Sequence, residues 1–179
     1  MVMMCGLSFS GKSTFARLLA RELDAAVVSL DAINEERGLH GGEGIPGSEW
    51  ATTHRVGEER VSALLGAGTD VIVDDTGSPG FVREHWRDIA NRAGAEFSLV
   101  WVQIDPELQR TRLLENRESG TRHDVSDQVM SDHISGFEPP LAEDAILVDA
   151  RDVRDAAVAR RIADELNRGG AGVAGLGFV

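Results

Sequence analysis

The segment GLSFSGKST, residues 6–14, constrains the fold of this chain more than any other stretch. Gly6, Gly11, Lys12 and Ser13 satisfy the pattern G-x-x-x-x-G-K-[ST] of a phosphate-binding loop. Glycine lets the backbone turn tightly, so that successive N–H groups point at phosphate oxygens. A helix that follows such a loop presents its positive end to the same oxygens. We therefore expect a nucleotide-binding site at this loop.

The surroundings of the loop agree with this prediction. The short apolar stretch VMMC precedes it, and KSTFARLLARELD, with apolar residues at helical spacing, follows it. Strand, glycine turn and helix are the context that the motif requires, which disfavours a chance glycine turn. We expect ATP, with GTP as an alternative, together with Mg²⁺: Lys12 would meet the β and γ phosphates, and the Ser13 hydroxyl would complete the coordination of the metal. The residues expected to contact the nucleotide are Gly6, Ser8, Phe9, Ser10, Gly11, Lys12, Ser13 and Thr14.

Apolar strands alternate with amphipathic helices along the rest of the chain. The expected strands are AAVVSLD, DVIVDDTG, FSLVWVQI and AILVD, and the expected helices include residues 49–65, PELQRTRLLENR, 126–137 and 153–166. This alternation predicts an α/β protein with a parallel sheet covered by helices on both faces. A chain of 179 residues fits one domain. We place that domain at 1–168 and a flexible glycine-rich tail at 169–179.

The composition of the chain limits which partners and which cellular location we expect for the protein. The net charge of −12 disfavours nucleic acid and anionic lipid unless a local basic patch overrides it. No apolar run approaches the ~20 residues of a membrane span, and no basic region or cleavage site precedes the loop, so we expect a cytoplasmic protein without a membrane partner. Cys5 is the single cysteine, which excludes an intramolecular disulfide and a cysteine zinc site. Its place at the end of an apolar run predicts a buried strand residue.

The second predicted strand ends in the sequence VVSLD at Asp31. Because the carboxyl ends of parallel strands meet at one edge of a sheet, Asp31 would emerge beside the phosphate loop, where ligands bind in open α/β sheets. A carboxylate there accepts a hydrogen bond from an acceptor hydroxyl and takes its proton as the γ-phosphoryl group departs. The alternative is a helix N-cap, since AINEER follows Asp31. We favour catalysis, and both roles can coexist.

A pair of carboxylates, Asp74 and Asp75, ends the third predicted strand. This pattern is typical of a site at which a carboxylate holds magnesium, usually through water. Adjacent strand residues point to opposite faces of a sheet, so one of the two is expected to be structural, and the sequence leaves open which one. Thr76 is either a further polar contact or a turn residue before Gly77.

Taken together, these features resemble the small P-loop kinases related to polynucleotide 5′-kinase and zeta toxin, often described only as AAA-type ATP-binding proteins. The resemblance rests on GLSFSGKST, SLD, VIVDDT with Arg83 after it, RTRLLENR and VSDQVMSDHISGFEPPLAED, which are spread over residues 2–149. It implies a P-loop NTPase fold of the nucleoside/nucleotide-kinase type, with a five-stranded parallel sheet in the order 2-3-1-4-5. It also implies a helical, arginine-bearing lid over ATP, at about residues 107–137.

On this lid the resemblance places Arg112 and Arg117 as catalytic residues, with Arg110 and Arg122 as further candidates. Guanidinium groups near the transferred phosphoryl group would stabilise its charge, and closure of the lid would exclude water. The alternative for any single arginine is a solvated helix face, paired with glutamates of the same helix.

The chain departs from the polynucleotide kinases after the candidate catalytic aspartate. Those enzymes resemble RDDYR there, whereas this chain reads LDAINEERG, with Asn34 in the place of a substrate-binding arginine. The loss of that cation from an acidic protein makes a nucleic-acid 5′ end a poorer expectation. Arg37, one helical turn away, could replace the contact and keeps that alternative open. The candidate acceptor-binding residues are Asp31, Asn34, Arg37, His40, Glu43 and Arg83.

The sequence thus predicts an ATP- and Mg²⁺-dependent kinase that phosphorylates a hydroxyl of a small molecule, such as a nucleoside, a sugar or an antibiotic-like compound. One alternative is a polynucleotide 5′-hydroxyl kinase, and another is a nucleotide-dependent switch or binding module without transfer activity. Phe9 and Ser10 are expected to form the wall between the phosphates and the acceptor. The histidines show no metal-ligand spacing and are expected to face solvent or to cap helices; they are His54, His85, His123 and His133.

Overall fold

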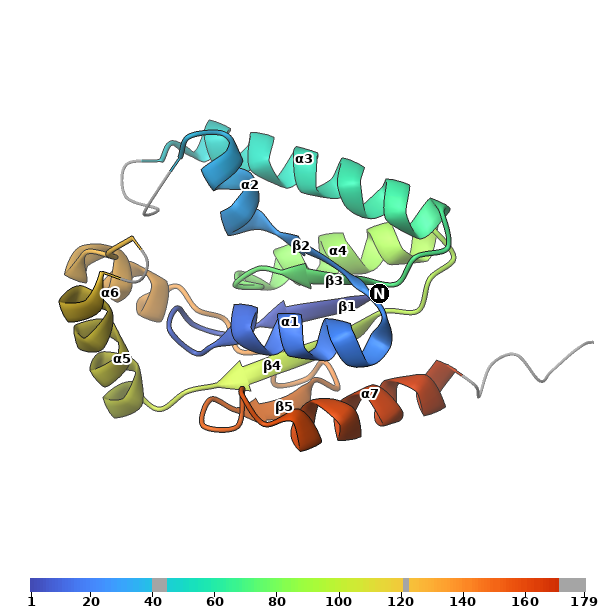
Figure 1. The fold of residues 1–179 in the computed structure, drawn as a ribbon. Coiled ribbons are helices and arrows are strands. Elements are labelled where there is room, and N and C mark those ends of the chain that lie inside the picture. The colour runs from blue at the N-terminus through green and yellow to red at the C-terminus, as the bar shows by residue number, and fades with distance from the viewer. Residues whose placement is uncertain (40–44, 121–122, 171–179) are drawn as a thin grey trace, which may run out of the picture.

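The fold is seen in a computed structural model that describes residues 1–39, 45–120 and 123–170 (Figure 1). These residues form a five-stranded parallel sheet in the order β2-β3-β1-β4-β5, which confirms the predicted fold class and strand order. The strands are β1 Val2–Cys5, β2 Ala26–Ser29, β3 Val71–Asp74, β4 Ser98–Gln103 and β5 Ile146–Asp149. Three predictions lie outside the described residues: the acceptor contacts His40 and Glu43, the lid candidate Arg122, and most of the tail.

The helices largely follow the apolar periodicity of the sequence. They are α1 Lys12–Leu23, α2 Leu30–Glu36, α3 Gly47–Gly66, α4 Gly80–Arg92, α5 Pro106–Ser119, α6 Asp127–Ser135 and α7 Ala156–Gly170. The last helix begins at Ala156 and not at the expected Val153, because the Asp155 side chain accepts a hydrogen bond from Ala157 N (2.8 Å) at its start. Figure 1 shows α5 and α6 standing apart from the sheet, in the region predicted to be a lid.

Successive side chains of β1 point to opposite faces of the sheet, and both faces are buried. Val2 and Met4 pack in the cluster that contains α1 and α7, whereas Met3 and Cys5 pack in the cluster that contains α3 and α4. Both helical layers are visible in Figure 1. This two-sided burial is why the strand reads as a continuous apolar run.

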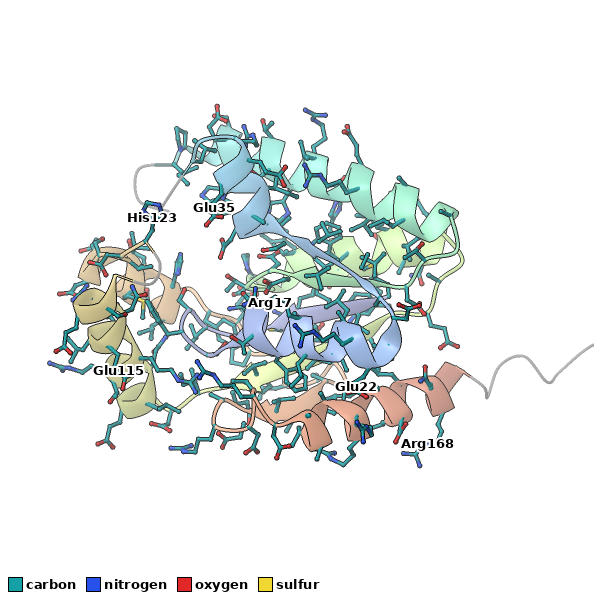
Figure 2. All side chains as sticks on the ribbon, viewed as in Figure 1. Arg17, Glu22, Glu35, Glu115, His123 and Arg168 are labelled. Atoms are coloured by element: carbon teal, nitrogen blue, oxygen red, sulfur yellow. The ribbon has the colours of Figure 1, made fainter. Side chains whose placement is uncertain are left out.

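Polar and charged side chains cover the outside of the molecule, such as Arg168 on α7 and Glu115 on the separate helix α5 (Figure 2). None of the helices in the described part of the chain combines the length and the apolar character that crossing a membrane requires. Because all the strands are parallel, their carboxyl ends lie at one edge, and the phosphate loop, the start of α2 and the residues after β3 are found there.

Candidate active site

The loop between β1 and α1 has a backbone that requires glycine at both ends. Gly6 has φ +143°, and a Cβ atom there would lie 2.4 Å from the Val102 carbonyl oxygen. Gly11 has φ +95°, and a Cβ atom would lie 2.8 Å from a Val153 methyl group. Within the described residues, no side chain caps α1, and its first turn carries no acidic residue. Its first N–H groups are therefore available to bind phosphate.

Lys12 lies beside all three aspartates that the sequence singled out. Its Nζ donates a hydrogen bond to the Leu7 carbonyl oxygen (3.1 Å), so the side chain folds back over the loop. Burial lowers the pKa of Lys12, and the charges of Asp74, Asp31 and Asp75 oppose that change. Three carboxylates, one on α2 and two at the end of β3, thus act on one phosphate-loop lysine.

Of the two aspartates after β3, Asp74 faces the phosphate loop. It is 6% exposed and pairs in register with Ser29 of β2. Burial raises the pKa of Asp74, and a hydrogen bond with the Ser13 side chain and the charge of Lys12 oppose the rise. The structure therefore brings together Ser13 and Asp74, two of the three predicted magnesium ligands.

Asp75 has different surroundings. Its Oδ1 accepts a hydrogen bond from Thr76 N (2.6 Å), whereas its Oδ2 is buried next to α4. Burial raises the pKa of Asp75, and the charge of His54 opposes the rise. Asp75 Oδ2 and Trp86 Nε1 form no hydrogen bond of ordinary geometry, although the indole lies near enough to help stabilise the carboxylate. Asp75 thus faces the interior, as expected for one member of the pair.

The oxygen atoms of Ser13 and Asp74 fit a magnesium ion. Proteins bind Mg²⁺ through one or two carboxylates together with substrate phosphates and water, and rarely through a complete protein cage. Within the described ranges, no group of three or more His, Cys, Asp or Glu side chains is placed to hold a metal ion. Nucleotide phosphates would supply the remaining ligands.

Asp31 occupies the first turn of α2 and not the end of a strand, which corrects its expected location. β2 ends at Ser29, and Ser29 is also the N-cap of α2, because its Oγ accepts a hydrogen bond from Ala32 N (3.4 Å). The capping role considered for Asp31 thus belongs to Ser29. Asp31 is exposed, and its charge acts on Lys12. Its carboxylate is therefore accessible beside the phosphate loop.

Two candidate acceptor contacts, Asn34 on α2 and Arg37 at the C-cap of this helix, have hydrogen-bond partners on α3. Asn34 is buried, and its Oδ1 accepts a hydrogen bond from Thr53 Oγ1 of α3. Arg37 forms an ion pair with Glu49 and donates hydrogen bonds to the Glu49 carbonyl oxygen (2.8 Å) and to Thr53 Oγ1 (2.5 Å). These contacts join α2 and its C-cap to α3, and the expected acceptor contacts of both residues stay predictions.

Arg83 is buried and has several hydrogen-bond partners within the protein, and its expected contact with the acceptor stays a prediction. Only 3% of it is exposed, and its guanidinium donates to Glu143 Oε1 (2.8 Å from Nε), to the Gly77 carbonyl oxygen (2.5 Å) and to the Glu138 carbonyl oxygen (2.9 Å). A buried arginine with this many acceptors stabilises the packing of α4 against the segment before β5.

The lid helix α5 holds the backbone of the phosphate loop. Arg112 donates to the carbonyl oxygens of Phe9 (3.0 Å) and Ser10 (2.9 Å), and also to that of Ala150 after β5 (2.6 Å). Gln109 Nε2 donates to the Ser8 carbonyl oxygen (2.8 Å). In this structure Arg112 thus contacts the carbonyl oxygens of the loop. The predicted contact of Arg112 with the transferred phosphoryl group stays a prediction.

Phe9 packs against the lid, and its expected place in a wall between the phosphates and the acceptor stays a prediction. Its side chain packs with Leu113, Val125 and Met130 in a small apolar cluster, so it joins the loop to both lid helices. Phe9 has φ 64°, a backbone conformation that costs energy in a residue other than glycine. Burial among lid side chains offsets that cost.

Arg117, the second lid arginine, faces acidic residues of the lid. It forms ion pairs with Asp124 and Asp127 and donates a hydrogen bond to the Val125 carbonyl oxygen (2.9 Å). The partners differ from the same-helix glutamates considered as the alternative. The catalytic role of Arg117 stays a prediction.

Sequence reasoning missed the contact that His133 makes. Its side chain is exposed, as expected, and its Nδ1 lies 3.1 Å from Ser8 Oγ of the phosphate loop. Spacing carried no signal for this contact, because residues 8 and 133 meet only through the placement of α6.

Comparison with known proteins supports a kinase-like fold. A sequence model of a family described as AAA domain matches residues 1–140. A shikimate kinase of Gloeobacter violaceus (strain ATCC 29082 / PCC 7421) is 35% identical over 118 residues, which cover 65% of this chain and 62% of that protein. The chain thus matches less than two thirds of the length of this curated relative.

Among solved structures, Chaetomium thermophilum Kti12 in complex with ADP-AlF3 has a TM-score of 0.73 at 18% identity, over 93% of this chain and 97% of that chain. Mycobacterium tuberculosis APS kinase CysC in complex with AMPPNP and APS has a TM-score of 0.68 at 22% identity, over 93% and 96%. At these identities the likeness shows the fold. Because the family match spans most of the sequence and the fold agrees with it, the chain belongs to this AAA domain family of small P-loop kinases.

Proposed function

We propose that this protein is an ATP- and Mg²⁺-dependent kinase that transfers the γ-phosphoryl group to a hydroxyl of a small molecule. One observation carries the proposal: Lys12 of the phosphate loop lies within electrostatic reach of both Asp74, a candidate magnesium ligand, and Asp31, an exposed carboxylate with no capping duty. A nucleotide site and a candidate base thus share one edge of the sheet.

The chain's own residues suit phosphoryl transfer. Lys12 and the first N–H groups of α1 would hold the phosphates. Mg²⁺, held by Ser13, Asp74 and phosphate oxygens, would neutralise phosphate charge. Asp31 would accept a hydrogen bond from the acceptor hydroxyl, orient it and take its proton as the phosphoryl group leaves. Most of the acceleration would come from positioning and electrostatics.

The charges around Asp31 favour a small-molecule acceptor over the 5′ end of a nucleic acid. Binding of a phosphate backbone requires accessible cations, and the net charge of the chain is −12. The arginines near α2 are engaged, because Arg37 pairs with Glu49 and Arg60 pairs with Glu36. Two relatives support the same class of acceptor, since the shikimate kinase is named for a small molecule and the APS kinase was solved with APS.

The test is a screen of hydroxylated metabolites and antibiotics for acceptor-dependent ATP consumption, with mass spectrometry to detect a phosphorylated product. Wild type, Lys12→Ala and Arg55→Ala are assayed in parallel. Arg55 is a matched control, because its 61% exposed side chain pairs only with Glu59 one turn along α3 among the described residues. We expect one acceptor class to be phosphorylated by wild type and Arg55→Ala, and a loss of about 10²-fold or more in Lys12→Ala.

Two outcomes would contradict the proposal. Slow ATP hydrolysis that no acceptor accelerates, without a phosphorylated product, would favour the nucleotide-dependent switch. Transfer only to a 5′-hydroxyl oligonucleotide, with a rate that falls steeply with salt, would favour the polynucleotide kinase.

A further inference from the structure

A contact between α6 and the phosphate loop lies next to the groups expected to react. His133 Nδ1 and Ser8 Oγ are 3.1 Å apart, within hydrogen-bond distance. The imidazole can accept the Ser8 proton at Nδ1, or donate to Ser8 Oγ in its other tautomer. This is a side-chain bond from the lid to the loop, in contrast to the bonds of α5, which reach only loop carbonyl oxygens.

The charges that face His133 show where it lies. They belong to Lys12 of α1, Asp31 of α2 and Asp132 of α6 itself. Lys12 and Asp31 are the proposed phosphate-binding cation and the proposed base. The Ser8 contact places His133 at the phosphate loop, where the charges of Lys12 and Asp31 act on it, although it comes from a helix far along the chain.

The two lid helices are attached to the loop by different means. α5 is held through Gln109 and Arg112 by hydrogen bonds to loop carbonyl oxygens, and Phe9 packs against Leu113. At its C-terminal end α6 has exposed residues on both sides of His133, including Ile134 at 50% exposure. Its N-terminal half is held by burial of Met130 and by the Ser126 cap. Among the described residues, the Ser8 contact is thus the side-chain bond from the C-terminal end of α6 to the phosphate loop, and Ser78 Oγ donates a second bond, to the carbonyl oxygen of the C-cap residue Gly136 (3.2 Å).

We propose that His133 is a positioning residue. Its hydrogen bond to Ser8 holds the C-terminal end of α6 closed over the phosphate loop, and it also keeps the Ser8 side chain in place on the side where the acceptor would bind. The role of this bond in catalysis rests on the proposed function. The bond itself can be tested without any acceptor. Burial and the charge of Lys12 lower the pKa of His133, which favours the neutral imidazole at physiological pH.

The experiment measures amide hydrogen exchange of α6 in the ligand-free chain for wild type, Ser8→Ala, His133→Ala and the double variant. His133→Asn is the conservative rescue, because an amide can take the place of Nδ1 in the hydrogen bond. Ser131→Ala, exposed on the same helix, is the control. Exchange of α1 and α7 in the same samples reports whether each variant is folded.

We expect each single alanine variant to speed the exchange of α6 about two- to tenfold, the range of one hydrogen bond, with α1 and α7 unchanged. The double variant should be no faster than the faster single variant, as for two partners of one interaction. His133→Asn should be slower than His133→Ala, and Ser131→Ala should match wild type. Additive effects, unchanged exchange in either single variant, or no rescue by asparagine would overturn the proposal.

Binding of Mg²⁺–AMPPNP by the same variants separates this inference from the proposed function. We expect His133→Ala to weaken binding about two- to tenfold, because an open lid leaves the phosphates less enclosed. If wild type bound no AMPPNP, the proposed kinase function would fail, while the exchange measurements would still decide on the Ser8–His133 bond.

Discussion

Arg112 and Phe9 are joined by a 3.0 Å hydrogen bond from the Arg112 guanidinium, in the lid helix α5, to the Phe9 carbonyl oxygen in the phosphate loop. The same guanidinium also reaches the carbonyl oxygens of Ser10 and Ala150. One lid arginine therefore ties the loop to the end of β5. The carbonyl oxygens of Ser8, Phe9 and Ser10 thus face α5, which holds this part of the loop.

Replacement of Arg112 should loosen the phosphate loop. We expect Arg112→Ala to weaken Mg²⁺–ATP binding about tenfold and to lower the free energy of unfolding by about 1.5–3 kcal/mol, the range for hydrogen bonds to a charged group. Arg112→Lys should rescue little, because an ammonium cannot span three carbonyl oxygens as the planar guanidinium does. Isothermal titration calorimetry and urea unfolding measure the two effects. Full rescue by lysine would show that charge alone matters here.

Neutralisation of Asp31 should separate catalysis from nucleotide binding. Asp31 is exposed and does not cap α2, so Asp31→Asn should leave stability within about 0.5 kcal/mol. If Asp31 is the general base, kcat/KM for the acceptor should fall at least ~10²-fold while the Kd of Mg²⁺–ATP changes little. Steady-state kinetics on the acceptor found by the screen measure this. A loss of less than threefold, on the order of 0.6 kcal/mol, would exclude the general-base role.

Removal of Arg83 should destabilise the fold. Arg83→Ala would leave Glu143 and the carbonyl groups of Gly77 and Glu138 without their buried cation, at a cost of about 3–5 kcal/mol. Arg87→Ala is the matched control, because Arg87 pairs with the same Glu143 but is 34% exposed. Loss of this surface pair should cost about 1 kcal/mol or less. Denaturant unfolding of both variants measures the difference, and equal destabilisation would contradict the structural role of Arg83.

Cys5 should be unreactive in the folded protein and should make stability depend on pH. Burial raises the pKa of Cys5 to about 11, whereas an unfolded cysteine ionises near ~8.5. Between these values the unfolded chain has lost a proton that the folded chain keeps, so the free energy of unfolding falls as pH rises through this window. Wild type should therefore lose about 2 kcal/mol more than Cys5→Ala between pH 8 and pH 10.

Denaturant unfolding of both proteins at the two pH values tests this, and equal losses would contradict it. A disulfide reagent at pH 8 should modify Cys5 only at the rate at which the protein opens, since the thiol is fully buried. Rapid modification of the native protein would place Cys5 outside the core.

Most of the fold could be predicted from the sequence, because its signals are local. The period of the apolar residues marks helices and strands, and the glycines of the loop are required by backbone angles and close contacts at Gly6 and Gly11. The resemblance to P-loop kinases supplied the strand order. The start of α2 was placed wrongly because Ser29, Leu30 and Asp31 suit either a strand end or a helix start, and the capping bond to Ser29 decides between them.

The sequence by itself determined that this chain folds as a parallel α/β domain with a phosphate loop, since motif and periodicity are properties of neighbouring residues. Only the tertiary structure decided that Asp74 faces Ser13 while Asp75 faces α4, that Arg83 and Arg37 form ion pairs with Glu143 and Glu49, and that Phe9 and His133 belong to the lid contact. A side chain's role depends on which distant element packs against it. That packing follows from burial of whole helix and strand faces and not from the residue's own neighbours in the chain.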